Sequence, residues 1–274
     1  MINKINRFSG IILFVLLINS CGQKNTPAPI VLPVTMDDSS RTIIERAIAY
    51  SGGYDHWLEK KTISFDKKTN TYDSTGHIIR EVNQHFDYMI RPEFRAKVSY
   101  TLHDTAITLI HDGSIARKLY NGKISNEQND INSAWNSSLG SQYVISMPYK
   151  LKDPGIKTEY RGFMTLQDGL SAQVIKSSYM AGVGGNPDHV WYYYFEPGTG
   201  KLLANAMKTK NNSWDFTRYE NFEKADGLLF PGIRKTYTAD TLNKPGRLIY
   251  EYRHSNIILD KTWPEGYFKI PEDK

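Results

Sequence analysis

Histidines next to carboxylates are the side chains of this sequence that could exchange protons in catalysis. His56 follows Asp55 in the stretch GGYDHW, and His189 follows Asp188 in GGNPDH. A carboxylate that orients an imidazole is part of many acid–base sites. Both pairs are also typical of a helix cap or loop with a surface histidine, and this structural interpretation is favoured at both places. We therefore expect no catalytic dyad in either pair.

The other histidines do not have the spacing of a metal site. His77 and His85 are eight residues apart in one expected strand, which separates them by about 27 Å and prevents them from sharing an ion. His103 and His111 have the same spacing, and the sequence does not decide whether a turn falls between them. The histidines therefore predict no metal centre.

Three carboxylates near the end of the chain could gather in one place, but a solvated strand end accounts for them equally well. They are Glu220, Glu223 and Asp226. The sequence contains no G-x-S-x-G elbow, H-E-x-x-H helix, P-loop or paired-cysteine site. The glycine-rich stretch AGVGGNP lacks the spacing of a dinucleotide-binding turn and indicates a loop. We expect a protein that is not an enzyme and that holds no cofactor.

The single cysteine of this 274-residue chain follows an apolar run directly. Before Cys21 lie Lys4, Arg7 and the apolar residues 11–18, without any acidic residue, as in an export signal. The run is shorter than the roughly 18 residues of a membrane-spanning helix. The stretch LINSC resembles the lipobox of bacterial lipoproteins, in which the cysteine is lipidated and the signal is cleaved before it. We expect residues 1–20 to be a cleaved signal peptide and Cys21 to be a lipid anchor rather than a free thiol.

Residues 21–38 are expected to form a flexible tether, because the stretch is rich in proline and has no helical or strand period. One folded domain over 39–274 follows.

The net charge gives no sign of a nucleic-acid partner. Removal of two cations with the signal lowers it from +5 to +3, and the sequence has no basic run interleaved with aromatic residues. No acidic cluster follows Cys21, which favours an outer-membrane lipoprotein that faces the periplasm.

The folded domain starts with helical patterns and then changes to a period of two. Apolar residues on one face and a Gly-Gly stop predict a helix over 41–50, with Thr42 and Glu45 spaced as a capping box. The stretch DHWLEK predicts a short helical turn with Trp57 as its apolar contact. From 94 to 102 apolar and polar residues alternate, which predicts a half-buried strand.

A neighbouring strand has the same alternation. Its inner face is predicted to consist of Ile78, Val82, Phe86 and Tyr88. Its polar residues are predicted to face water and are Glu81, Asn83, His85 and Asp87. One helix is expected over 126–146, where Pro148 ends it. Further strands are expected at 157–163, 172–179, 190–195, 201–208, 214–222, 232–238 and 248–258.

Short turns between these strands predict an antiparallel meander. About ten or eleven consecutive strands must curl strongly. The expected fold is therefore mainly β (α+β): a strongly curved, half-open antiparallel barrel with two or three helices on its concave side.

Several longer segments resemble a known family. AIAYSGGYDHW, HDGSIARKLYNGK, YVISMPYKLKDPG, WYYYFEPGTGKL and GLLFPGIRKTY are similar to an uncharacterised family of Gram-negative lipoproteins, a domain of unknown function. That family in turn resembles the LolA/LolB lipoprotein-carrier superfamily. The resemblance implies a half-open barrel whose hydrophobic cavity receives acyl chains, and it transfers no individual ligand-contacting residue.

The stretch VWYYYFEP holds the candidate cavity residues. Alternation places Trp191, Tyr193 and Phe195 on one face of a strand and Tyr192 and Tyr194 on the other. Packing in a core with tyrosines at the rim explains this pattern most simply. A wall that contacts lipid is the functional alternative.

The stretch PYKLKDPG holds a second candidate. Tyr149 and Leu151 suit packing beneath the preceding helix, and Pro154 suits a tight turn. The functional alternative is a mobile lip of the cavity.

These observations predict a membrane-anchored lipoprotein of the cell envelope that binds or presents an apolar ligand, an acyl chain or lipid, in a barrel cavity. The alternative is a non-enzymatic interaction module that docks on an outer-membrane complex through its sheet edge or its aromatic strand. A hydrolase with an unrecognised site is the least favoured hypothesis.

Overall fold

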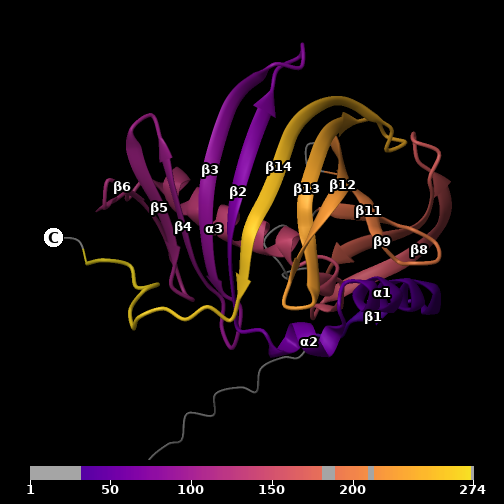
Figure 1. The fold of residues 1–274 in the computed structure, drawn as a ribbon, viewed down its shortest axis with the longest axis horizontal. Helices are drawn as coiled ribbons and strands as arrows, with labels where there is room; N and C mark the ends of the chain where they lie inside the picture. Colours follow the sequence, from indigo (N-terminus) through magenta and orange to yellow (C-terminus); the bar gives the residue numbers. More distant parts are fainter. Residues whose placement is uncertain (1–31, 181–188, 209–212, 273–274) are drawn as a thin grey trace, which may run out of the picture. The chain divides into compact units, whose positions relative to one another are not determined.

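A single antiparallel sheet forms most of the described chain (Figure 1). The structure is a computed structural model that describes residues 32–180, 189–208 and 213–272. In these ranges fourteen strands form one sheet in the order β1-β8-β9-β10-β11-β12-β13-β14-β2-β3-β4-β5-β6-β7. Neighbouring strands pair antiparallel except β1 and β8, which are parallel. The expected open, curved, mainly β fold is confirmed.

The strands of the first half are β1 (Thr35–Met36), β2 (Thr62–Tyr72), β3 (Ile78–Met89), β4 (Arg95–Leu102), β5 (Thr105–His111), β6 (Ala116–Tyr120) and β7 (Lys123–Ile124). Those of the second half are β8 (Ile156–Thr165), β9 (Ser171–Tyr179), β10 (Val190–Phe195), β11 (Leu202–Lys208), β12 (Trp214–Ala225), β13 (Leu228–Ala239) and β14 (Pro245–Leu259). The count exceeds the expected ten or eleven partly because β1 and β7 have two residues each, too few to show a period.

Three α-helices and one short 3-10 helix accompany the sheet in the described ranges: α1 (Asp38–Tyr50), α2 (Tyr54–Glu59), α3 (Gln128–Ile145) and η1 (Tyr149–Lys152). Figure 1 shows α3 behind β2, β3 and β4, and it packs against β4, β5, β6 and β13. Its buried residues share one core with α1, α2 and the inner faces of the strands. The helices therefore cover the concave side of the sheet, as expected.

The first helix begins earlier than the sequence pattern predicts. Its N-cap is Asp37, whose carboxylate accepts a hydrogen bond from the Ser40 amide at 2.8 Å. The capping box predicted at Thr42 and Glu45 is wrong, because Thr42 already lies inside the helix and donates to the Asp38 carbonyl. The Asp37 carboxylate satisfies free amides of the first turn, so the helix begins before Thr42.

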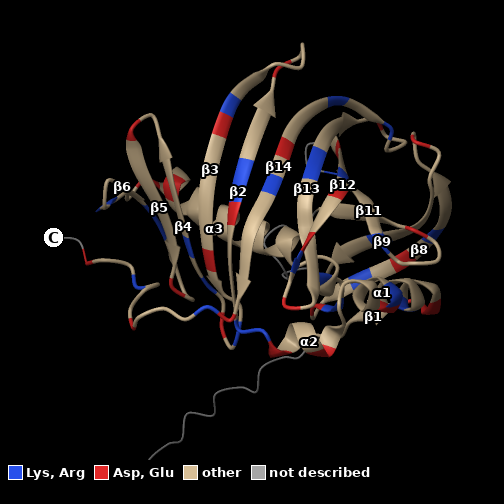
Figure 2. Ribbon diagram, viewed as in Figure 1, with Lys and Arg blue, Asp and Glu red and all other residues tan. Residues whose placement is uncertain are grey.

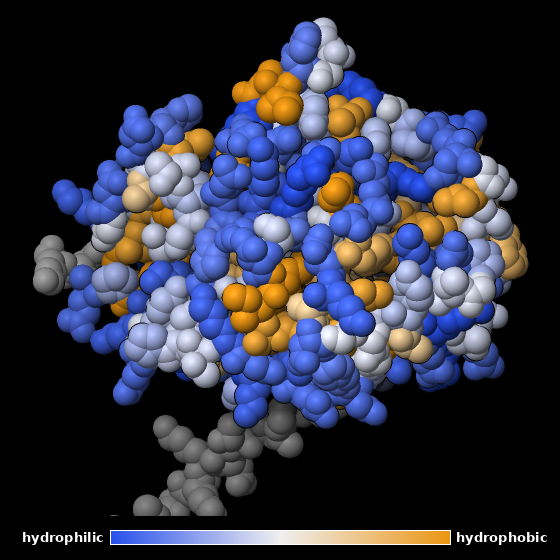
Figure 3. Space-filling view, in the orientation of Figure 1, coloured by the Kyte–Doolittle hydropathy of each residue, from blue (hydrophilic) through white to orange (hydrophobic). Residues whose placement is uncertain are grey.

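Two predictions for β3 also need correction. Ile78 is 52% exposed, since the β2–β3 hairpin extends beyond the helices that cover the inner face. Figure 3 shows an apolar patch near the tip of this hairpin, where Ile79 is exposed as well. Asp87 does not face water and is only 1% exposed, because the segment after β14 covers the outer face of β3 at this point.

Charges of both signs are distributed along β2, β3, β13 and β14 (Figure 2). They pair across strands on the outer face, as Lys68 does with Glu81 at 2.7 Å and Lys235 with Glu220 at 2.9 Å. Such exposed pairs contribute little stability. No helix in the described ranges has the length and apolarity needed to cross a membrane.

Candidate functional site

Two adjoining hollows lie between α3 and the concave face of the sheet. The first, which we call the apolar chamber, has a volume of about 510 Å³. Its lining includes Trp135, Leu139 and Tyr143 of α3. This volume lies within the range of about 300–1,000 Å³ that is typical of small-molecule sites.

The second hollow, which we call the cationic chamber, has a volume of about 250 Å³. Lys67, Arg234 and His254 line it together with polar side chains of β11, β12 and β13. The two chambers have four lining residues in common, which are Gly140, Val144, Trp191 and Met207. The apolar chamber and the chamber lined by basic residues therefore adjoin along these four residues.

Strand pairing brings the basic residues of the cationic chamber together. Lys67 of β2 lies directly opposite His254 of β14, and Arg234 of β13 lies opposite Tyr252. Tyr252 and His254 are two residues apart, so their side chains point to the same face of β14. All these side chains consequently point to the concave side, from three neighbouring strands.

Lys67 and Arg234 form no ion pair with any carboxylate of the described chain at or below 4.0 Å. The Lys67 ammonium lies 3.4 Å from the Ser141 hydroxyl and 4.5 Å from the centre of the Phe86 ring. Arg234 is 8% exposed, its guanidinium stacks over Tyr252, and its Nε has no hydrogen-bond partner in the described structure. Two partly desolvated cations thus face the chamber without a counterion.

Burial changes the acid–base behaviour of these groups. Burial and the nearby Arg234 charge lower the pKa of Lys67 to about 7. Burial and then the Arg234 and Lys67 cations lower the pKa of His254 well below its usual value. The acidic side chain of this chamber, Asp215, has its pKa raised by burial, so its charged form is disfavoured rather than stabilised by the cations.

His254 is expected to make the stability of the protein sensitive to acid. Its Nδ1 donates to the Pro231 carbonyl at 2.7 Å. We expect the free energy of unfolding to fall as the pH drops below about 6.5, by up to about 1.4 kcal/mol per pH unit, because the unfolded imidazole binds a proton that the folded one resists. Above that pH the contribution is fully present. His254→Asn, which retains a donor, should reduce this slope in urea unfolding measured from pH 7.5 to 4.5.

The matched control is His103→Asn. His103 is exposed in the β4–β5 turn, where its φ of 46° is one that asparagine tolerates. We expect the control to keep the acid slope of the wild type. Equal slopes for His254→Asn and the wild type would contradict the assignment of this acid sensitivity to His254.

The aromatic residues predicted at the cavity are divided between four places. Trp191 lines both chambers. Tyr193 and Phe195 lie in the core, where the Tyr193 hydroxyl is 2.9 Å from that of Tyr143. On the other face, Tyr194 is buried in a second apolar cluster with Phe216, whereas Tyr192 lines a groove of about 1250 Å³.

That outer groove is larger than either chamber, but its lining is of mixed charge. It includes the ion pair between Arg218 and Asp168, and Leu242 at its rim is 63% exposed. Docking of a protein partner through the aromatic strand stays a prediction. Tyr192 is accessible for such a contact in the outer groove, whereas Tyr194 is 0% exposed and cannot make it.

The residues predicted as a lip differ in their burial. Tyr149 is buried, stacks on Trp57 at 4.9 Å between ring centres, and donates to the Ser51 carbonyl. Leu151 is 0% exposed in the same core. Pro154 lines the apolar chamber. A lip role therefore stays a prediction for Pro154 alone.

The candidate catalytic pairs are not reproduced as pairs. The carboxylate near His56 is that of Asp226, at 3.6 Å, and not that of its chain neighbour Asp55. His189 lines the apolar chamber, and its expected neighbour Asp188 lies outside the described residues. Asp226 pairs with Lys60, and Glu220 with Lys235, so the three late carboxylates do not form one group. No cluster of three or more potential metal ligands occurs in the described ranges.

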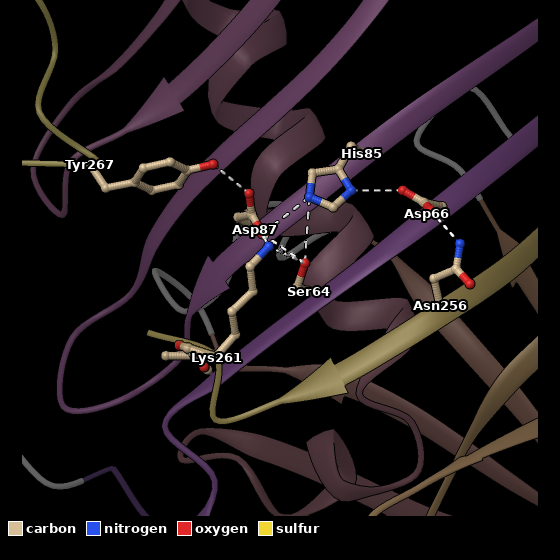
Figure 4. Close-up of polar contacts among 8 residues, drawn as sticks. Ser64, Asp66, His85, Asp87, Asn256, Lys261 and Tyr267 are labelled. Atoms are coloured by element: carbon tan, nitrogen blue, oxygen red, sulfur yellow. Dashed lines mark hydrogen bonds and ion pairs between the residues drawn. The ribbon is translucent and has the colours of Figure 1, made fainter. Parts of the chain in front are cut away.

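A polar cluster on the outer face contains a serine, a histidine and carboxylates (Figure 4). Asp66 and His85 are opposite each other across β2 and β3, as are Ser64 and Asp87. The His85 Nδ1 lies 2.7 Å from Asp66, and its Nε2 lies 3.5 Å from the Ser64 hydroxyl. The order of groups is that of a nucleophile, base and carboxylate.

The contacts of this cluster favour a structural role. Ser64 is 1% exposed and donates to Asp87 at 2.7 Å, so its hydroxyl proton faces a carboxylate rather than the imidazole. Burial would raise the pKa of Asp87, but hydrogen bonds from Tyr267 and Ser64 outweigh burial and lower it. Tyr267 donates to Asp87 at 2.6 Å, and Lys261 is 3.3 Å from the same carboxylate. The cluster thus holds the segment after β14 against the sheet.

Sequence reasoning did not find Lys67, Arg234 or His254. A signal was present, since Lys67 is two residues from Phe65 and must share its inner face. His254 likewise follows Tyr250 and Tyr252 at steps of two. Charged or titratable residues at inward positions of aromatic strands therefore formed a pattern that indicates this site.

Comparison with solved structures shows what the fold is similar to. A domain named for outer membrane lipoprotein sorting, from Vibrio parahaemolyticus, is 8% identical with a TM-score of 0.50, and the match covers 83% of this chain and 95% of that one. A DUF1329 family protein from Desulfovibrio piger is 9% identical with a TM-score of 0.51, and the match covers 84% and 96%. These likenesses confirm the fold expected from the resemblance to lipoprotein carriers.

A LolA superfamily protein from Nitrosomonas europaea also matches, at 10% identity and a TM-score of 0.48, with coverage of 84% and 96%. A comparison with curated proteins found no match. The model of a family of unknown function, DUF6503, matches residues 30–262. The match spans most of the chain, as the resemblance to a lipoprotein family of unknown function predicts, and this chain belongs to the DUF6503 family.

Proposed function

We propose that this protein is a lipid-binding lipoprotein of the cell envelope. Lipidated Cys21 anchors it in the outer membrane, and the domain on its tether faces the periplasm. The observation that carries the proposal is the chamber between α3 and the concave sheet, with its apolar lining and a volume of about 510 Å³. An acyl chain of 16 carbons would gain on the order of 12 kcal/mol on leaving water, before ordering and association costs.

The lining of the apolar chamber suits a hydrocarbon chain. Trp135, Tyr143 and Trp191 present aromatic surface to it, and Tyr143 lies 5.7 Å from Trp191 between ring centres. Lys150 and Asp153 also line it but pair with each other, so neither charge requires a ligand. The chamber thus offers apolar contact to a ligand, and its two charged lining residues already satisfy each other.

The test uses the full chain carrying Cys21→Ser, because acyl chains found with this variant cannot come from the covalent anchor. We expect protein purified without detergent to retain lipid that denaturing mass spectrometry detects after extraction. A fluorescent fatty acid should bind and be displaced by unlabelled lipid. Absence of both extractable lipid and fluorescent binding, from protein with the far-UV spectrum of a folded β domain, would contradict the proposal.

A further inference from the structure

The cationic chamber has a chemical requirement that the apolar chamber lacks. Moving a charge out of water is costly unless an opposite charge or hydrogen bonds compensate for it. The Arg234 Nε is buried without a partner, and Lys67 has one long contact with the Ser141 hydroxyl. Both side chains line the chamber.

The donors available in this chamber match an anion. A guanidinium and an ammonium bind carboxylates and phosphates through short, charge-assisted hydrogen bonds. Thr217 and Thr236 of the same lining have hydroxyls 2.8 Å apart, and Asn205 accepts from Tyr219 at 2.9 Å. The surrounding polar groups therefore bond to one another. Lys67 contacts Ser141 and Arg234 hydrogen-bonds to Tyr219, so neither cation has a carboxylate partner among the described residues.

The position of these cations relative to the apolar chamber determines the class of ligand. Gly140, Val144, Trp191 and Met207 line both chambers. A chain in the apolar chamber therefore reaches the cations at this shared boundary. A small anion alone would leave the apolar chamber empty, and a neutral lipid would leave the cations without a counterion.

We propose that the ligand is an anionic amphiphile, whose carboxylate or phosphate head group is bound by Lys67 and Arg234 while its hydrocarbon chain occupies the apolar chamber. This inference rests on the proposed function and adds the charge of the ligand to it. His254 is a neutral neighbour in this arrangement, since the two cations and burial disfavour its charged form.

The experiment compares ligands that share one chain and differ in head group. Hexadecanoate, hexadecyl phosphate and hexadecanol compete with a neutral fluorescent probe, N-phenyl-1-naphthylamine, on the full chain carrying Cys21→Ser. We expect the two anions to bind at least about tenfold more tightly than the alcohol, as suits hydrogen bonds between charged groups. Acetate and inorganic phosphate serve as head groups without a chain, and we expect them to compete only weakly.

Variants assign the preference to the two cations. Lys67→Met and Arg234→Met should each reduce the preference for the anions over hexadecanol about tenfold. The matched controls are Lys68→Met and Lys235→Met, whose side chains pair with Glu81 and Glu220 outside the chambers. Each control should keep the preference. Thermal unfolding of every variant reports whether it is folded.

The outcomes separate this inference from the proposed function. Equal binding of hexadecanol and the two anions to the wild type would overturn the inference and leave the proposed function standing. If acetate or inorganic phosphate competed as strongly as the long-chain anions, the inference that the ligand is an amphiphile would be overturned. The result would indicate a small-anion site. Failure of the probe and of all three long-chain compounds to bind would overturn the proposed function itself.

Discussion

Gly140→Trp should weaken lipid binding at least about tenfold while the protein stays folded. Gly140 lies on α3 at the boundary that the apolar and cationic chambers share. A Cβ atom built at this position would have no atom within 4 Å, so a larger side chain enters open space rather than backbone. An indole there would fill the space that a hydrocarbon chain needs. We expect extractable lipid and fluorescent fatty-acid binding to fall by on the order of tenfold or more.

The matched control is Gly140→Ala. Alanine adds one methyl group and leaves the boundary open, and it is favoured over glycine inside a helix by about 1 kcal/mol. We expect this variant to bind lipid like the wild type and to unfold at a slightly higher temperature. Unchanged lipid binding by Gly140→Trp, with a normal unfolding transition, would show that the chain of the ligand does not pass this boundary.

Trp57→Ala should cost about 3–5 kcal/mol in the free energy of unfolding, the range for removal of a large aromatic side chain from a core. Trp57 is 4% exposed and stacks on Tyr149 at 4.9 Å. It also meets the edge of Phe230 at 6.1 Å, and the Arg91 guanidinium lies 5.0 Å from its ring centre. One side chain thus joins α2, η1 and β13, and its loss leaves a cavity among three elements.

The neighbouring residue supplies the control for this prediction. Leu58 is 45% exposed on the same helix, so Leu58→Ala should change the free energy of unfolding by at most about 0.5 kcal/mol. Urea unfolding of the wild type and both variants measures the difference. A loss below about 1 kcal/mol for Trp57→Ala would mean that the surrounding core collapses into the space and that Trp57 does not join these elements.

Most of the secondary structure was predictable because it depends on local periodicity. The alternation from 94 to 102 identifies β4, and the helical pattern that ends before Pro148 identifies α3. The predicted strands from 157 onward correspond to β8–β14. The strands β2, β5 and β6 and the edge strands β1 and β7 were not individually predicted. Of these, β1, β6 and β7 have five residues or fewer from which to recognise a period.

The errors occurred where distant segments meet. Asp87 has the position of a water-facing residue in β3, and the segment after β14 buries it through Tyr267 and Lys261. Tyr149 packs in the core, as its favoured structural interpretation predicts, but its partner Trp57, about ninety residues earlier, was not predicted. Neither contact can be recognised from the local pattern of the sequence around one partner.

The sequence by itself determined the class of fold and the aromatic strand β10, because these depend on composition and on the period of neighbouring residues. An export-type start with Cys21 stays a prediction from the sequence. The tertiary structure alone decided which face of that strand is core, and that Lys67, Arg234 and His254 meet beneath α3. Lys67 of β2 is far along the chain from Arg234 and His254, which lie on the consecutive strands β13 and β14. Their proximity, and the desolvation that follows from it, depends on the pairing of β13, β14 and β2 rather than on any local motif.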